Sequence, residues 1–172
     1  MSKPEAGEPV NAKGRFERHA LNLGKLIGNL QTIEMAARLA IVKLDKASGD
    51  RVQAQLPQVK IDELVELNAF TNKDDLNQTL EKYNKWASLD CRVDRKPIVM
   101  LRDALAHGRI FGTGSMKYLR LLKFSQKAND GKVAVVLAVD MTDEWFQESL
   151  LLLTQAIAKI TKALDYESRE FT

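Results

Sequence analysis

Residues 142–164 read TDEWFQESLLLLTQAIAKITKAL, and the spacing of their apolar side chains decides the class of fold. Large apolar residues recur there at alternating four- and three-residue steps without a break: Phe146, Leu150, Leu153, Ile157, Ile160 and Leu164. This period places them on one face of an α-helix. Thr142 followed by two acidic residues is a favourable helix start. We therefore expect a long helix whose seam packs within a bundle or, less often, against a second chain.

Three helices are expected in the first half of the chain. A helix is expected over about residues 15–46, where a stripe of apolar residues recurs at three- and four-residue steps: Ala20, Leu23, Ile27, Leu30, Ala37, Ile41 and Leu44. A short helix is expected over about residues 62–69. The next helix should be capped by Thr71 or Asn72 and should end near Leu89.

A further helix and a hairpin are expected before the terminal helix. Pro97 suits the first turn of a helix, and Gly108 suits its end. Two strand-like runs, residues 116–124 and 132–139, then flank an Asn-Asp-Gly turn signal at 129–131. The predicted fold is therefore mainly all-α: a bundle of about four to five helices with a small β-hairpin inserted before the last long helix.

Length and composition indicate one domain. The chain has 172 residues, of which 45% are hydrophobic and only 6% aromatic, so aliphatic residues must fill the core, as is usual in packed helices. Residues 1–14 are predicted to be a disordered tail, and residues 15–170 a single helical domain. Residues 47–60 contain glycine and proline without a hydrophobic period and predict a loop.

The sequence favours a cytoplasmic protein that is not bound to a membrane. Its start lacks the apolar core of a signal peptide, and its longest apolar cluster is too short to span a bilayer. Cys91 is the only cysteine, which excludes an intrachain disulfide and favours a reducing compartment. Two histidines and one cysteine, well separated, give no zinc spacing, and residues 112–115 lack the ending of a P-loop. No metal or cofactor site is predicted.

Positive charge is concentrated in one part of the chain. The formal net charge is +3, yet residues 92–127 contain nine basic and two acidic residues. A phosphate-rich ligand should therefore be drawn to this region. Charge alone is equally consistent with a solvated basic face.

Within that region, residues 101–109 read LRDALAHGR. Arg102 and His107 lie five positions apart on the helix predicted to end at Gly108, so they are separated by about 140° around its axis. The length of the arginine must bring them together. Asp103 and His107 are four positions apart, so the carboxylate can accept a ring N–H and fix the orientation of the imidazole.

This segment, an arginine, a small polar residue, three mainly apolar residues and His-Gly on a short helix, resembles the R-x4-6-H motif of the HEPN superfamily. The resemblance covers about ten residues, and the helical setting agrees loosely over most of the chain. It implies a metal-independent endoribonuclease in which the ribose 2′-hydroxyl attacks the adjacent phosphorus. It also implies a cytoplasmic toxin or phage-defence effector whose partners are RNA, a second copy of the chain and, in a toxin system, an antitoxin protein.

The resemblance also implies roles for individual residues. Arg102 would bind phosphate, His107 would act as general acid or base, and Asp103 would orient the histidine. Arg109 and Lys117 would hold flanking phosphates. Two copies of the motif would meet across a dimer axis, so a monomer would carry half a site. Aspartate departs from the asparagine that is more familiar after the arginine, and it places a negative charge beside the phosphate site.

Two other interpretations remain open. The chain is then either a catalytically inactive module of the same family that binds nucleotide, RNA or a protein partner, or a purely structural helical dimer. In the structural interpretation, Arg102 pairs with Asp103 or with a neighbouring helix. His107 then merely precedes a helix-capping glycine, where its cation would suit the dipole of the helix end.

Overall fold

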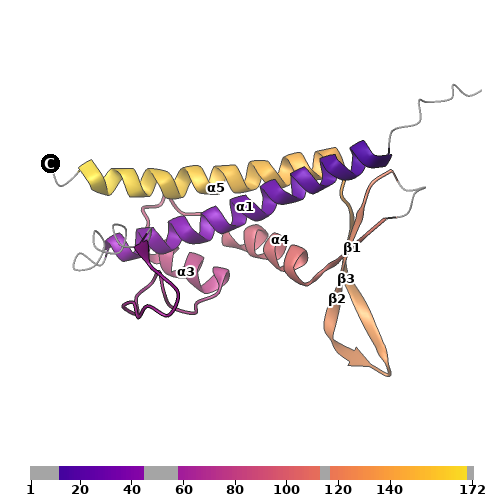
Figure 1. Cartoon of the computed structure of the whole chain (residues 1–172), viewed down its shortest axis with the longest axis horizontal. Coiled ribbons are helices and arrows are strands. Elements are labelled where there is room, and N and C mark those ends of the chain that lie inside the picture. Colours follow the sequence, from indigo (N-terminus) through magenta and orange to yellow (C-terminus); the bar gives the residue numbers. More distant parts are fainter. Residues whose placement is uncertain (1–11, 45–57, 113–116, 170–172) are drawn as a thin grey trace, which may run out of the picture.

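The structure, a computed structural model, describes residues 12–44, 58–112 and 117–169 (Figure 1). Within these ranges the protein is mostly helical, with a small three-stranded antiparallel sheet, which confirms the predicted mainly helical class. In chain order the elements are α1 (Ala12–Leu44), α3 (Leu76–Trp86), α4 (Arg95–His107), β1 (Arg109–Phe111), β2 (Arg120–Asn129), β3 (Lys132–Asp140) and α5 (Asp143–Arg169).

Three predictions fall partly outside these ranges. The predicted tail, residues 1–14, is described only from Ala12, where α1 already begins. The predicted loop at residues 47–60 is described only from residue 58, and most of the glycine-rich stretch at 112–115 is not described. None of the helices in the described part of the chain combines the length and the apolar character that crossing a bilayer requires.

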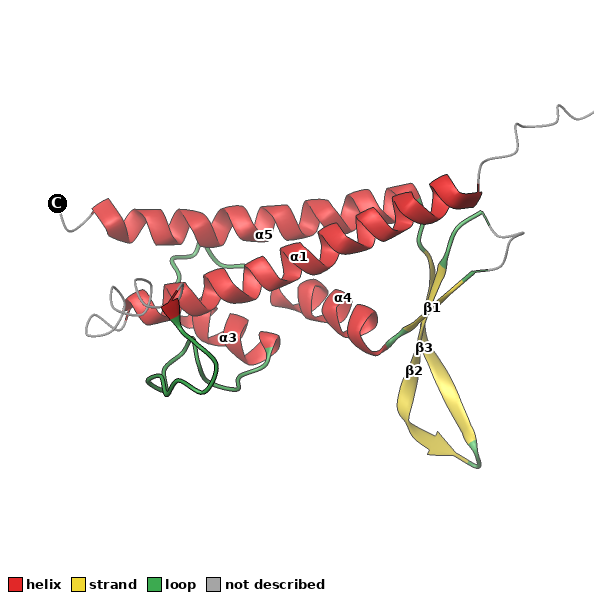
Figure 2. Ribbon diagram, in the orientation of Figure 1, coloured by secondary structure: helices red, strands yellow, loops and turns green. Residues whose placement is uncertain are grey.

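The long helices α1 and α5 form the spine of the molecule (Figures 1 and 2). They lie side by side and run in the same direction, with Arg18 3.8 Å from Asp143 at the start of α5. The predicted start of α5 is confirmed, because the hydroxyl of Thr142 accepts a hydrogen bond from the backbone N–H of Trp145 at 3.1 Å. The predicted seam is also confirmed, with three of its residues fully buried: Phe146, Leu153 and Ile160.

The buried face of α1 agrees in part with the predicted stripe, of which Leu30 and Ala37 are buried. Ile27 is 48% exposed, although it belongs to the predicted stripe. The core also takes Leu26, Ile33 and Ala40, which lie beside the predicted stripe on the helix. The open side of α1 also carries Gly24 and Gly28, where an added Cβ would meet nothing within 4 Å.

The short helix predicted over residues 62–69 is absent from the structure. Asp62 has a φ of 66°, which is left-handed backbone and interrupts a right-handed helix. The apolar side chains that suggested the helix remain in solvent, with Leu64 98% exposed. A turn follows instead, in which the side-chain oxygen of Asn68 accepts from the backbone N–H groups of Phe70 and Thr71.

Helix α3 begins later than predicted because Asp75, not Thr71 or Asn72, is its cap. The carboxylate of Asp75 accepts a hydrogen bond from the backbone N–H of Gln78 at 2.8 Å. The backbone N–H of Asp75 in turn donates to the side-chain oxygen of Gln78. This reciprocal pair satisfies two donors at the helix start. The helix ends at Trp86 rather than near Leu89.

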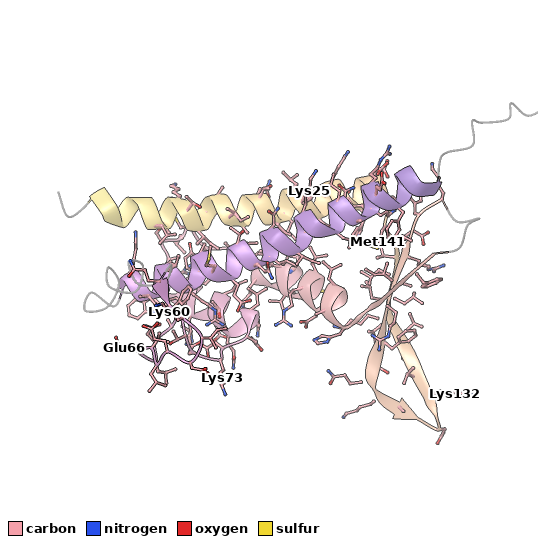
Figure 3. The ribbon with its side chains drawn as sticks, viewed as in Figure 1. Lys25, Lys60, Glu66, Lys73, Lys132 and Met141 are labelled. Atoms are coloured by element: carbon pink, nitrogen blue, oxygen red, sulfur yellow. The ribbon has the colours of Figure 1, made fainter. Side chains whose placement is uncertain are left out.

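The sheet contains one strand more than the predicted hairpin. A hairpin does precede α5, although its first strand runs over Arg120–Asn129 rather than over residues 116–124. Its turn uses Asp130 and Gly131 with φ of 50° and 72°, as a tight hairpin turn requires. β1 pairs with β2 on the other edge, giving the order β1-β2-β3. Figure 3 places Lys132 at the far tip of the hairpin and Met141 where the sheet joins the helices. The hairpin thus projects away from α1 and α5, while Leu121 and Met141 at its base are buried in the core.

Candidate functional site

The R-x4-H segment lies on α4, as predicted. The carboxylate of Asp94 caps the first turn, so α4 begins at Arg95, slightly before Pro97. At the other end the backbone N–H of Gly108 donates to the Ala104 carbonyl at 2.8 Å. An added Cβ at Gly108 would collide with that carbonyl oxygen, which explains the need for glycine at this turn into β1.

Arg102 sits on the flank of α4 that faces α1. Its side chain is 31% exposed, and it lines a hollow of about 340 Å³ together with Ile27 of α1 and Ala106 of α4. We call this the α1–α4 hollow. The guanidinium is therefore partly accessible to solvent, although the acidic residues Glu34 and Asp75 line the same hollow. The guanidinium also already has an ionic partner. Its Nη1 lies 2.9 Å from Oδ1 of Asp103.

The predicted hydrogen bond between Asp103 and His107 is not formed in the structure. Within the described residues, the carboxylate of Asp103 pairs with Arg102 instead. The helical spacing does allow the aspartate to reach the histidine, but the long arginine side chain folds back onto its neighbour and takes the carboxylate. The orientation of His107 therefore does not depend on Asp103 in the isolated chain.

His107 is the last residue of α4, and its side chain is exposed. Its backbone carbonyl accepts a hydrogen bond from Nη1 of Arg109 at 3.2 Å, and the Gly108 carbonyl accepts from the same nitrogen at 3.2 Å. The guanidinium of Arg109 thus covers the carbonyl end of α4, where the helix dipole favours a cation. The structure places Arg102 and His107 on the last two turns of α4, and Arg109 at the start of β1, directly after the helix.

Lys117 is placed differently from the other predicted residues. Its ammonium lies 5.0 Å from the ring centroid of Tyr118. A hydrogen bond to Tyr118 raises the pKa of Lys117, and the nearby carboxylates of Glu144 and Asp143 contribute to the same shift. Lys117 therefore faces the acidic start of α5, and no contact in the described chain joins it to His107.

The basic segment at residues 92–127 is partly neutralised in the fold. Arg95 lies 3.4 Å from Glu81 of α3, and Arg120 lies 3.7 Å from Asp140 of β3. These acids come from outside the segment, so the local excess of positive charge is smaller than the sequence suggests. The exposed cations nearest to His107 along the chain are Arg109 and the partly exposed Arg102.

A second hollow lies on the opposite flank of α4. It has a volume of about 460 Å³ and is bounded by α4, the sheet and the first turns of α5. We call it the α4–α5 hollow. Asp103 lines this hollow, whereas Arg102 lines the other. The two charged neighbours of the motif thus belong to different faces of α4.

Sequence reasoning singled out Asp103 but not the two other polar residues of the α4–α5 hollow. Lys123 of β2 and Ser149 of α5 both line it. The position of Lys123 could have been predicted, because in a strand it lies on the same face as the apolar Leu121 two residues before it.

Among the described residues, no group of three or more His, Cys, Asp or Glu side chains is arranged to hold a metal ion. Comparison of the chain with protein-family models, with curated proteins and with solved structures found no match.

Proposed function

We propose that this chain is a metal-independent endoribonuclease of the HEPN type that acts as a homodimer. The observation that carries the proposal is the position of Arg102 and His107 on the last two turns of α4, with both side chains accessible to solvent. An exposed imidazole and a guanidinium at the same helix end are the residue types needed for phosphodiester transesterification. Arg109, at the same helix end, adds a further cation.

In the proposed reaction, one imidazole accepts the proton of the ribose 2′-hydroxyl as its oxygen attacks phosphorus. A second imidazole donates a proton to the departing 5′-oxygen, which leaves a cyclic phosphate. The guanidinium of Arg102 stabilises the charge that develops on the phosphorane oxygens, because it offers directed donors and stays charged at all working pH values. Two copies of the chain would supply the two histidines.

The Arg102–Asp103 pair gives Asp103 a role that differs from the predicted one. We infer that it holds the guanidinium in the free protein and that RNA phosphate replaces the carboxylate. A pair that is about one-third exposed is weak enough for such an exchange, since pairs of this kind contribute only about 0–1 kcal/mol.

The test is cleavage of RNA by the purified protein in the presence of EDTA. We expect cleavage to persist under chelation and to fall by roughly 10²–10⁴-fold in His107→Ala, the range typical for loss of a general acid or base. Products should carry a cyclic phosphate. Lys96→Ala is the matched control, because it removes an exposed side chain from the other end of the same helix. Equal activity in His107→Ala and wild type would contradict the proposal.

The second candidate is a catalytically silent HEPN-like module that binds nucleotide, RNA or a protein partner. The ion pair between Arg102 and Asp103 favours it, because a carboxylate beside the guanidinium opposes an anionic transition state. RNA binding measured by fluorescence anisotropy separates the two. A silent module would bind RNA with a dependence on Arg102 and yield no product on prolonged incubation.

A further inference from the structure

The α4–α5 hollow is shaped like a ligand site. Its volume of about 460 Å³ lies within the range of small-molecule pockets, which are mostly apolar with a few placed polar groups. The apolar part of its wall comes from four elements, α4, β2, β3 and α5. Its main members are Val99, Leu121, Leu137, Val139, Trp145 and Leu152.

One lysine interrupts this apolar wall. The register of β2 and β3 pairs Leu121 with Val139 and Lys123 with Leu137, so all four side chains share one face of the sheet. Leu121 on that face is 0% exposed. Lys123 is partly buried and therefore sits on the core-facing side of the sheet. An ammonium group among apolar side chains gains from an anionic partner.

The chain does not supply that anion in the described residues. The carboxylate that lines the same hollow belongs to Asp103, and it is 2.9 Å from the guanidinium of Arg102. Lys123 itself forms no ion pair in the part of the chain that the structure describes. The hollow thus combines an apolar wall with one uncompensated positive charge.

We propose that the α4–α5 hollow binds an apolar anion, a molecule with an aromatic or aliphatic body and one carboxylate or sulfonate group. The body packs against the apolar wall, and the anionic group pairs with Lys123. Trp145 forms part of this wall and is fixed edge-on against Phe146, with ring centroids 5.1 Å apart. A bound aromatic body therefore meets an ordered indole.

The test uses anilinonaphthalene sulfonate as the anionic probe and the uncharged N-phenylnaphthylamine as its neutral counterpart. Trp86 is 66% exposed and does not line the hollow, so the Trp86→Phe protein keeps Trp145 as its sole tryptophan. We expect saturable energy transfer from Trp145 to the sulfonate. The sulfonate should bind at least about tenfold more tightly than the neutral probe, as expected for a charge-assisted contact.

Three variants in this background locate the probe and its charge. Lys123→Met should weaken sulfonate binding about tenfold and leave the neutral probe unchanged. Lys127→Met is the matched control, because it removes an exposed lysine farther along the same strand. Ser149→Phe, at a partly exposed position on α5, should fill the hollow and abolish binding of both probes.

Circular dichroism would establish that each variant is folded. Sulfonate binding that is equal in Lys123→Met and Lys127→Met would overturn the proposal, because the lysine would then point to solvent and bind no anion. Binding that survives in folded Ser149→Phe would also overturn it, since the probe would then lie elsewhere.

Discussion

The side chain of Arg38 on α1 is 9% exposed, whereas that of Arg102 on α4 is 31% exposed. The guanidinium of Arg38 is surrounded by acceptors. Nη1 donates to the carbonyl of Ala69 at 3.0 Å and to Oδ1 of Asn72 at 2.8 Å, and Nη2 donates to Glu34 at 3.0 Å. These bonds join α1 to the loop that leads into α3.

Among the residues that the structure describes, Arg102 has one ionic partner, its own neighbour Asp103. Because the two residues are adjacent in the sequence, this ion pair joins no distant parts of the chain and contributes little to the fold. Arg38 is therefore an arginine committed to structure, and Arg102 is one that remains available to a ligand. The difference between them lies in what each guanidinium contacts, which the residue type alone does not reveal.

Arg38→Met is expected to have the largest effect on stability. The substitution keeps most of the apolar stem but removes the donors that the partly buried Ala69 carbonyl and Glu34 carboxylate accept from, which costs about 3 kcal/mol. Urea unfolding followed by circular dichroism would measure the change. Arg95→Met is the control, because Arg95 is 41% exposed and should lose less than about 1 kcal/mol. If both variants lost a similar free energy of unfolding, Arg38 would contribute no more to the fold than an exposed arginine.

Tyr83→Phe tests a second buried polar contact with a smaller expected effect. The hydroxyl of Tyr83 donates to the carbonyl of Cys91 at 3.0 Å, and the residue is 1% exposed. Burial raises the pKa of Tyr83 well above its usual value, so the phenol remains a donor at any working pH. Removing the hydroxyl should lower the free energy of unfolding by about 1–2 kcal/mol. An unchanged midpoint in thermal unfolding would mean that this bond contributes nothing net.

Local signals in the sequence predicted the elements that depend on local chemistry. Thr142 begins α5, Gly108 follows α4, and Asp130 with Gly131 forms the hairpin turn. Each of these depends on a cap or on a backbone angle that neighbouring residues determine. The sequence also placed Arg102 and His107 on one helix correctly.

The predictions were wrong where an element depends on residues distant in the sequence, or where one side chain has two possible partners nearby. The strand β1 forms by pairing with β2, with Ile110 opposite Leu121. A strand of three residues is too short to show a periodicity from which it could be predicted. Asp103 could pair with either Arg102 or His107, and the four-residue helical spacing alone favoured His107. Arg102 took the carboxylate instead. The buried face of α1 depends on where α3 and α5 pack, which no helical period specifies.

Asp103→Asn probes the available arginine. The substitution removes a charge pair that is about one-third exposed, so stability should change by less than about 1 kcal/mol. RNA binding should tighten several-fold, because the guanidinium is released and a negative charge is lost. Anisotropy titrations at several salt concentrations would measure this. Weaker cleavage without tighter binding would instead indicate that Asp103 orients His107 in the complex.

The smallest expected effect concerns another exposed pair, Asp90 and Lys162, which joins the loop before α4 to α5 at 2.6 Å. Hydrogen bonds from Lys162 and from Ser88 lower the pKa of Asp90 from 3.8 to about 2. Because the folded pKa lies below the unfolded one, the pair stabilises the fold above pH 3.8, and this contribution disappears as the pH falls towards 2. Carboxyl NMR should report a rise in the pKa of Asp90 in Lys162→Met and none in the control Lys159→Met, whose lysine donates to the Arg92 carbonyl. If Asp90 already titrates near 3.8 in the wild-type protein, the pair is not formed in solution.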